Sequence, residues 1–143
     1  MPIALKRVYD PPSRTDGARV LVDRLWPRGV SKDAAKLTSW LKDLAPSDAL
    51  RKWYHSHPVM WLMFRKKYLE ELRAPEASAA LEQLYELVES HDRVTLLYAS
   101  RNLKQNNATV LKELLDGTRK PPAASGAVRA RGVKRGRATA PRP

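Results

Sequence analysis

Two short runs of apolar residues stand out along the chain, and each is followed at once by polar residues. The run at 20–22 leads into Asp23 and Arg24, and the run at 94–98 leads into Ser100. Uninterrupted apolar runs of this length are typical of strands covered on both faces, as in α/β sheets. The pattern therefore predicts two buried strands, each ending in a polar loop.

Between and after these runs, apolar residues recur at helical spacing. Ser31 and Ser47 are suited to cap helices at 32–36 and 48–55. Further helices are predicted to begin at Pro58, to span 75–90 and to span 103–115, with Gly117 as the stop of the last one. The segment 37–45 suits either a strand or a helix, and we expect it to be extended.

A first strand is predicted at 3–9, and its untidy alternation of apolar and polar residues suits an edge position. The loop from this strand to the run at 20–22 is short for a parallel crossover, which usually needs about a dozen residues or more and a helix. The two strands are therefore either antiparallel neighbours or not neighbours. Together the elements predict a compact, three-layer-like α/β domain over residues 1–116, with a short, largely parallel sheet flanked by helices.

The residues that follow the two buried strands suggest a binding site. Ligands of open α/β sheets lie at the carboxyl ends of the strands, and parallel neighbours would bring both loops to one edge. Arginine presents a planar fork of donors that suits phosphate or carboxylate oxygens. The sequence therefore predicts a pocket for a small anionic ligand, lined by Asp23, Arg24, Arg28, Arg51, Ser100, Arg101 and Asn106.

A structural interpretation of the same residues stays open. Asp23 beside Arg24 and Arg28 would also form an internal salt-bridged turn, with Trp26 in the core. Asn106 would also make a hydrogen bond at the start of a helix. The richness in tryptophan at Trp40, Trp53 and Trp61 hints at a partner-binding surface, although core packing accounts for it as well.

Composition excludes several kinds of chemistry. The chain has no cysteine, so disulfides and thiolate catalysis are excluded, and its three histidines have no metal-ligand spacing. No glycine-rich phosphate loop, Ser-His-Asp order or glycosidase pair is present, so we expect no metal or cofactor, and catalysis is left open. No apolar run approaches the ~20 residues of a membrane span and there is no signal-peptide core, so we expect a cytoplasmic protein with no membrane partner.

The net charge of +12 is concentrated at the end of the chain. Residues 117–143 hold eight bases and no acid, which leaves 19 bases and 15 acids in residues 1–116. A segment of Pro, Ala, Gly, Arg and Lys cannot form a core, so we expect a disordered basic tail. The tail would bind nucleic acid non-specifically through Arg129, Arg131, Lys134, Arg135 and Arg137, or it would be a solubilising extension.

Several long motifs resemble one known family in the right order. They are KRVYDPP at 6–12, DGARVLVDRLWPRG at 16–29, LAPS at 44–47 with LRKWYH after it, FRKKYLEEL at 64–72 and VTLLYASRNLKQNNA at 94–108. Together they resemble the YeaO-like proteins, a domain family of unknown function (DUF 488), over about residues 3–115. The resemblance implies a compact bacterial α/β domain in the cytoplasm and supplies no mechanism.

One position departs from the family pattern. Similar proteins usually carry Asn-His-Ala where this chain has Asn106, Asn107 and Ala108. An amide does not titrate, so any proton transfer by that histidine would be absent from this chain.

Overall fold

Four parallel strands form one sheet in the computed structural model, which describes residues 3–118. The strands are β1 (Ile3–Arg7), β2 (Ala18–Leu21), β3 (Ser39–Trp40) and β4 (Val94–Tyr98), in the spatial order β1-β4-β2-β3. Leu96 of β4 lies opposite Leu5 on one side and Val20 on the other. The predicted α/β fold with a parallel sheet is confirmed, and β1 is the edge strand that its pattern indicated.

β1 and β2 are not neighbours, because β4 lies between them. Of the two alternatives that the sequence left open, the one in which these strands are not neighbours is therefore confirmed. Gly17 leads the chain into β2 with a φ of 66°, and a Cβ atom there would lie 2.1 Å from the Arg93 carbonyl oxygen. The next residue, Ala18, donates its N–H to that same oxygen at 2.9 Å. The close approach of the two backbones explains why this position holds glycine.

Five helices complete the described residues 3–118. They are α1 (Lys32–Ala35), α2 (Asp48–Ser56), α3 (Trp61–Glu71), α4 (Pro75–Ser90) and α5 (Asn107–Thr118). The predicted caps are confirmed, since the hydroxyls of Ser31 and Ser47 accept the N–H groups of Ala34 and Leu50. The bounds of α4 match the predicted range.

Two predicted helix starts are wrong. α3 begins at Trp61 and not at Pro58, because residues 57–60 form a turn closed by the Met60 N–H on the His57 carbonyl. α5 begins at Asn107 and not at 103, because the side chain of Asn102 accepts two N–H groups within a tight turn before the helix. The same helix continues through Gly117 to Thr118, so Gly117 is not its stop.

The segment 37–45 is extended in part. It contains the two-residue strand β3 and then a 3₁₀ turn, η2 (Lys42–Leu44). β3 pairs in parallel with β2, with Trp40 opposite Leu21.

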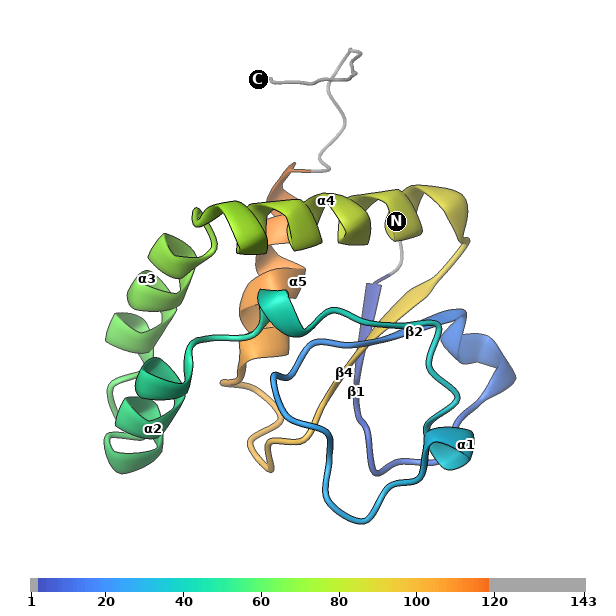
Figure 1. Cartoon of the computed structure of the whole chain (residues 1–143), viewed down its shortest axis with the longest axis horizontal. Helices are drawn as coiled ribbons and strands as arrows, with labels where there is room; N and C mark the ends of the chain where they lie inside the picture. The colour runs from blue at the N-terminus through green and yellow to red at the C-terminus, as the bar shows by residue number, and fades with distance from the viewer. Residues whose placement is uncertain (1–2, 119–143) are drawn as a thin grey trace. The chain divides into compact units, whose positions relative to one another are not determined.

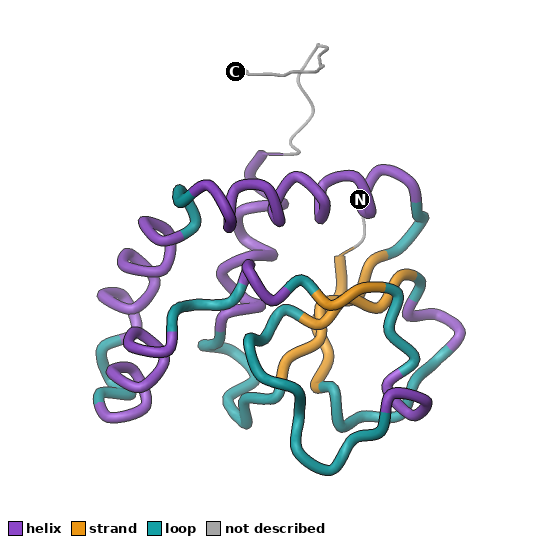
Figure 2. The backbone as a smooth tube through the Cα atoms, in the orientation of Figure 1, coloured by secondary structure: helices purple, strands orange, loops and turns teal. Residues whose placement is uncertain are grey.

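The two faces of the sheet are covered differently. On one face Val8, Leu21 and Leu97 pack under Trp26 and Leu37 of the β2–β3 connection and under Trp40 of β3. Much of that connection is loop (Figure 2). The strands separate α1 from α2 and α3, which lie to their left in Figure 1. This arrangement agrees with right-handed crossovers, which place the β2–β3 and β3–β4 connections on opposite faces.

The predicted basic tail lies almost entirely outside the described residues. Residues 119–143, which include Arg129, Arg131, Lys134, Arg135 and Arg137, are not described. Within residues 3–118, no helix is both long enough and apolar enough to cross a membrane.

Candidate functional site

The carboxyl ends of β2 and β4 meet at one edge of the sheet, since the two strands are parallel neighbours. Asp23, two residues after β2, accepts the backbone N–H of Ala99 through Oδ2 at 2.9 Å. Ala99 directly follows β4. The structure therefore brings together the two polar loops that the sequence singled out.

Asp23 is also bound by the start of α5. Asn107 donates through Nδ2 to Oδ1 of Asp23 at 3.0 Å and to the Val22 carbonyl at 2.9 Å. The indole N–H of Trp40 donates to the backbone carbonyl of Asp23 at 2.7 Å. An asparagine in the first turn of a helix is uncommon and indicates a polar role, but the sequence does not predict the partners of Asn107.

Burial governs the ionisation of Asp23. Removal from water raises the pKa of its carboxyl above the ordinary value, and the hydrogen bonds from Asn107 and Ala99 and the charge of Arg51 offset only part of that rise. Within residues 3–118, Asp23 makes no ion pair. The site therefore holds a carboxyl group whose negative charge is stabilised by hydrogen bonds and by a more distant guanidinium.

The salt-bridged turn considered from the sequence is wrong in its pairing. Arg24 donates to backbone carbonyls, from Nη2 to Ala45 at 3.2 Å and from Nε to Pro46 at 3.3 Å. It thus joins the β2–β3 loop to the chain before α2. The expected packing of Trp26 is present, because its ring meets the Trp40 ring edge to face at 5.3 Å.

Arg51 reaches the same region from α2. Its Nη2 lies 3.0 Å from Oδ1 of Asp48, and both side chains are about half exposed. The pKa of the Asp48 carboxyl is lowered, chiefly by the hydrogen bond from Arg51 and further by the charges of Arg51, Lys52 and Arg24. Arg24 and Arg51 therefore act on one exposed carboxylate, and Arg51 also acts on Asp23.

The other predicted site residues lie on the two loops and differ in their exposure and hydrogen bonding. Arg28 and Arg101 are exposed. The hydroxyl of Ser100 accepts the Asn102 N–H at 3.1 Å. Asn106 is 3% exposed.

Asn106 caps α5. Its Oδ1 accepts the Thr109 N–H at 2.9 Å, and its Nδ2 donates to the Asn102 carbonyl at 2.7 Å. These bonds give it the helix-start role that the sequence left open.

Arg7 is a residue of this edge that sequence analysis missed. From the end of β1 it donates through Nε to the Ser100 carbonyl at 3.0 Å and through Nη2 to the Ala99 carbonyl at 2.9 Å. It therefore fixes the loop that leaves β4. No local pattern signals this role, because the partners are more than 90 positions away in the chain.

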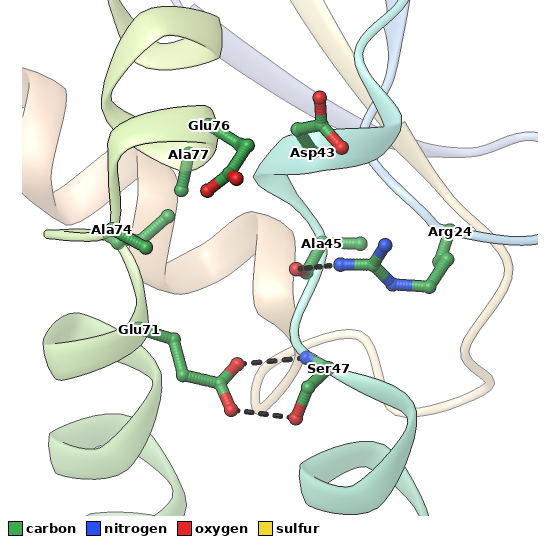
Figure 3. Close-up of a pocket in the computed structure, with 9 residues that line it drawn as sticks. Arg24, Asp43, Ala45, Ser47, Glu71, Ala74, Glu76 and Ala77 are labelled. Carbon is green, nitrogen blue, oxygen red and sulfur yellow. Dashed lines mark hydrogen bonds between the residues drawn. The ribbon is translucent and has the colours of Figure 1, made fainter.

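A cavity of about 390 Å³ lies beside Arg24, between η2 and the turn from α3 to α4 (Figure 3). Its lining includes three carboxylates, from Asp43, Glu71 and Glu76. Both oxygens of Glu71 are used, accepting from the N–H of Ser47 at 2.8 Å and from its hydroxyl at 2.6 Å. This excess of negative charge does not suit the small anion that the sequence predicts.

A buried ion pair lies away from this edge, at the amino end of β2. Asp16 and Arg19 meet at 2.5 Å, and Lys6 lies 3.1 Å from the other Asp16 oxygen. Both Asp16 and Arg19 are more than nine-tenths buried. The residues described, 3–118, contain no cluster of three His, Asp or Glu side chains able to hold a metal.

Comparison with known proteins places this chain in a family. Residues 2–127 match a family described as the inactive DUF488-N3 subclade. The chain belongs to this DUF488 family. The resemblance to YeaO-like proteins, inferred from the motifs, is thereby confirmed.

The match between this DUF488 chain and its relatives spans almost the whole length of each relative. It is 44% identical over 115 residues to the uncharacterised protein YeaO of Escherichia coli K12, which covers 80% of this chain and 97% of YeaO. It is 43% identical over 115 residues to the uncharacterised protein Rv3073c of Mycobacterium tuberculosis H37Rv, which covers 80% of this chain and 94% of that relative. No solved structure matches the chain.

Proposed function

We propose that this chain is a non-catalytic binding domain that holds a small anionic ligand, bearing phosphate or carboxylate oxygens, at the carboxyl ends of β2 and β4. The observation that carries the proposal is that Arg51 holds the exposed carboxylate of Asp48 at 3.0 Å, and that the charge of Arg24 also lowers the pKa of that carboxyl. Exposed ion pairs are weak. A ligand anion would therefore displace Asp48 from the Arg51 guanidinium at little cost.

Two observations support a non-catalytic role for this chain. The matching subclade is described as inactive. In addition, Asn107 occupies the position where the resemblance to YeaO-like proteins implies a histidine, and its amide donates to the Asp23 carboxylate. A carboxylate–imidazole pair is able to relay a proton at neutral pH, whereas a carboxylate–amide pair only orients groups.

The same loops would complete the ligand site. Arg101 and Arg28 are exposed on the loops after β4 and β2. They would reach outer oxygens of a ligand, while Arg7 and Asn106 hold the β4–α5 loop in place. Asp23 would accept a hydroxyl or amino group of the ligand, because its carboxylate has unused lone pairs.

The test measures the thermal midpoint of the full chain against inorganic phosphate, nucleotides, sugar phosphates and citrate. A ligand at a hundred times its Kd adds about 2.7 kcal/mol, which raises the midpoint by several degrees. We expect one class of compound to give this rise, and Arg51→Ala to abolish it. Arg73→Ala, which removes an exposed arginine from the α3–α4 turn, is the matched control.

Two results would reject the proposal. One is the absence of a midpoint shift with every compound. The other is an equal loss in Arg51→Ala and Arg73→Ala, which would indicate general charge attraction and no defined site.

A second candidate function is non-specific nucleic-acid binding by residues 117–143. It is favoured by the segregation of charge, since these residues carry eight bases and no acid. Arginine and lysine without interleaved aromatic residues suit contacts with the phosphate backbone.

A further inference from the structure

Apolar side chains are exposed together at the turn between α2 and α3. Val59 is 90% exposed, Leu62 77%, Met63 44% and Met60 37%. These four residues, here named the α2–α3 patch, lie within the five consecutive positions 59–63. Single exposed leucines occur elsewhere in this chain, at Leu25 and Leu103, and need no explanation. A contiguous exposed apolar patch, in contrast, marks an interaction site.

Positive charge accompanies the α2–α3 patch. On α3, Lys66 follows Leu62 by four positions and Lys67 follows Met63 by four, so the lysines lie beside the apolar side chains on the exposed helix face. Lys67 also places its Nζ 5.1 Å from the centre of the Trp53 ring, on the neighbouring helix α2. Helices α2 and α3 lie side by side (Figure 1).

Three of the five bases in residues 49–69 have acidic partners, since Arg51 and Lys52 lie against Asp48 and Arg65 pairs with Glu113. Among the described residues no ion pair is formed by the other two, Lys66 and Lys67, so they supply the positive charge beside the patch. A second copy of this chain would therefore bring like charges together over the patch. The chain's own basic tail would do the same, so charge complementarity favours neither occupant.

We propose that the α2–α3 patch docks an acidic, amphipathic polypeptide segment of a partner protein. Apolar side chains of the segment would cover Val59 and Leu62, and its carboxylates would pair with Lys66 and Lys67. Met60 and Met63 suit this use because the unbranched thioether side chain adapts to partners of different shape. The proposal is independent of the anion site, which lies at the strand ends.

The experiment selects a randomised peptide library, displayed on phage, against the immobilised full chain. An excess of the Leu62→Asp, Lys66→Glu double variant is present in solution as a competitor. Peptides that bind the basic tail or any other surface also bind this competitor and are removed. We expect the recovered peptides to combine aspartate or glutamate with large apolar residues.

Single variants then locate the binding. Leu62→Asp and Lys66→Glu should each raise the Kd of a recovered peptide about tenfold or more, as for central interface residues. Leu103→Asp alters a leucine of similar exposure, 61%, outside the patch and should leave the Kd unchanged. Circular dichroism of each variant confirms that the fold is retained, since both leucines are exposed.

Three outcomes would overturn the proposal. Selection could recover no peptide, or peptides without an excess of acidic residues. Alternatively, Leu62→Asp and Leu103→Asp could weaken binding equally. Finally, if no peptide is recovered but the full chain sediments with phosphatidylserine vesicles in a manner that requires Leu62, the patch binds a lipid surface.

Discussion

Asn107 donates through Nδ2 to Oδ1 of Asp23 at 3.0 Å, and this bond joins the first turn of α5 to the end of β2 across 84 positions of the chain. The same nitrogen donates to the Val22 carbonyl at 2.9 Å. The resemblance to YeaO-like proteins implies a histidine at this position. This chain therefore carries an amide, which does not titrate, where the family pattern has an imidazole. Substitutions at Asn107 and Asp23 test what this bond contributes.

Replacing Asn107 with histidine should place an imidazole beside the Asp23 carboxylate. We expect the pKa of that histidine to lie above its ordinary value of about 6.5, because the neighbouring negative charge favours the imidazolium form. The stability gained from this pair is then fully present below about pH 6.5 and is lost as the pH rises through the folded-state pKa. NMR titration and urea unfolding across this pH range measure both effects.

The control for this prediction removes the carboxylate. In the Asp23→Asn, Asn107→His double variant, the rise in the histidine pKa should disappear. A pKa below about 6.5 in the single variant would show that burial outweighs the carboxylate at this position.

Asp16→Asn should strongly destabilise the fold at neutral pH. Burial opposes the ionisation of Asp16, but the hydrogen bonds from the Ser13 N–H, Lys6 and Arg19 outweigh it and lower the pKa of the carboxyl. The variant leaves Arg19 buried without its counter-charge, at a cost of about 3 kcal/mol. Since the folded-state pKa is lowered, the wild-type advantage is fully present above the unfolded-state pKa of about 4 and is lost as the pH falls through the lower folded-state pKa.

Urea unfolding of both proteins at neutral and acid pH tests this prediction. Asp48→Asn is the matched control, because Asp48 and Arg51 form an exposed ion pair of a kind that contributes little. Its urea midpoint should stay close to that of the wild type. An equal effect of the two substitutions would contradict the role assigned to burial.

Gly17→Ala and Gly29→Ala distinguish the cost of backbone strain at a positive φ angle from the cost of a steric clash. Both glycines have positive φ angles, 66° and 80°. An added Cβ at Gly17 would lie 2.1 Å from the Arg93 carbonyl oxygen, whereas nothing lies within 4 Å at Gly29. We expect Gly29→Ala to cost about 1 kcal/mol from backbone strain alone, and Gly17→Ala to cost clearly more. Equal unfolding free energies would contradict the close approach of β2 to Arg93.

The basic segment beyond α5 should give salt-dependent binding to duplex DNA. If all eight bases neutralise phosphates, the logarithm of the binding constant falls with the logarithm of salt concentration with a slope of about −7. Truncation after Thr118 should abolish the binding and leave the thermal midpoint unchanged. Fluorescence anisotropy at several salt concentrations measures the slope, and undiminished binding by the truncated chain would assign the contact to residues before it.

The elements that local sequence specifies were predicted well. The fully buried strand β4 follows from the run VTLLY, and the bounds of α4 follow from the proline at its start and its helical spacing. The serine caps of α1 and α2 were also predicted, because a cap is a contact over three positions. The start of α5 was missed because the turn before it depends on the competing side chains of Asn102 and Asn106.

The sequence by itself determined the parallel α/β class, the polar ends of β2 and β4 and the separate basic segment, since apolar runs, loop lengths and charge are local properties. Only the tertiary structure decided that β4 inserts between β1 and β2, which brings Ala99 to Asp23. The tertiary structure alone also decided that Arg24 donates to backbone carbonyls and that Asn107 donates to the Asp23 carboxylate. Hydrogen-bond partners far apart in the chain are set by packing, and no periodicity along the sequence specifies them.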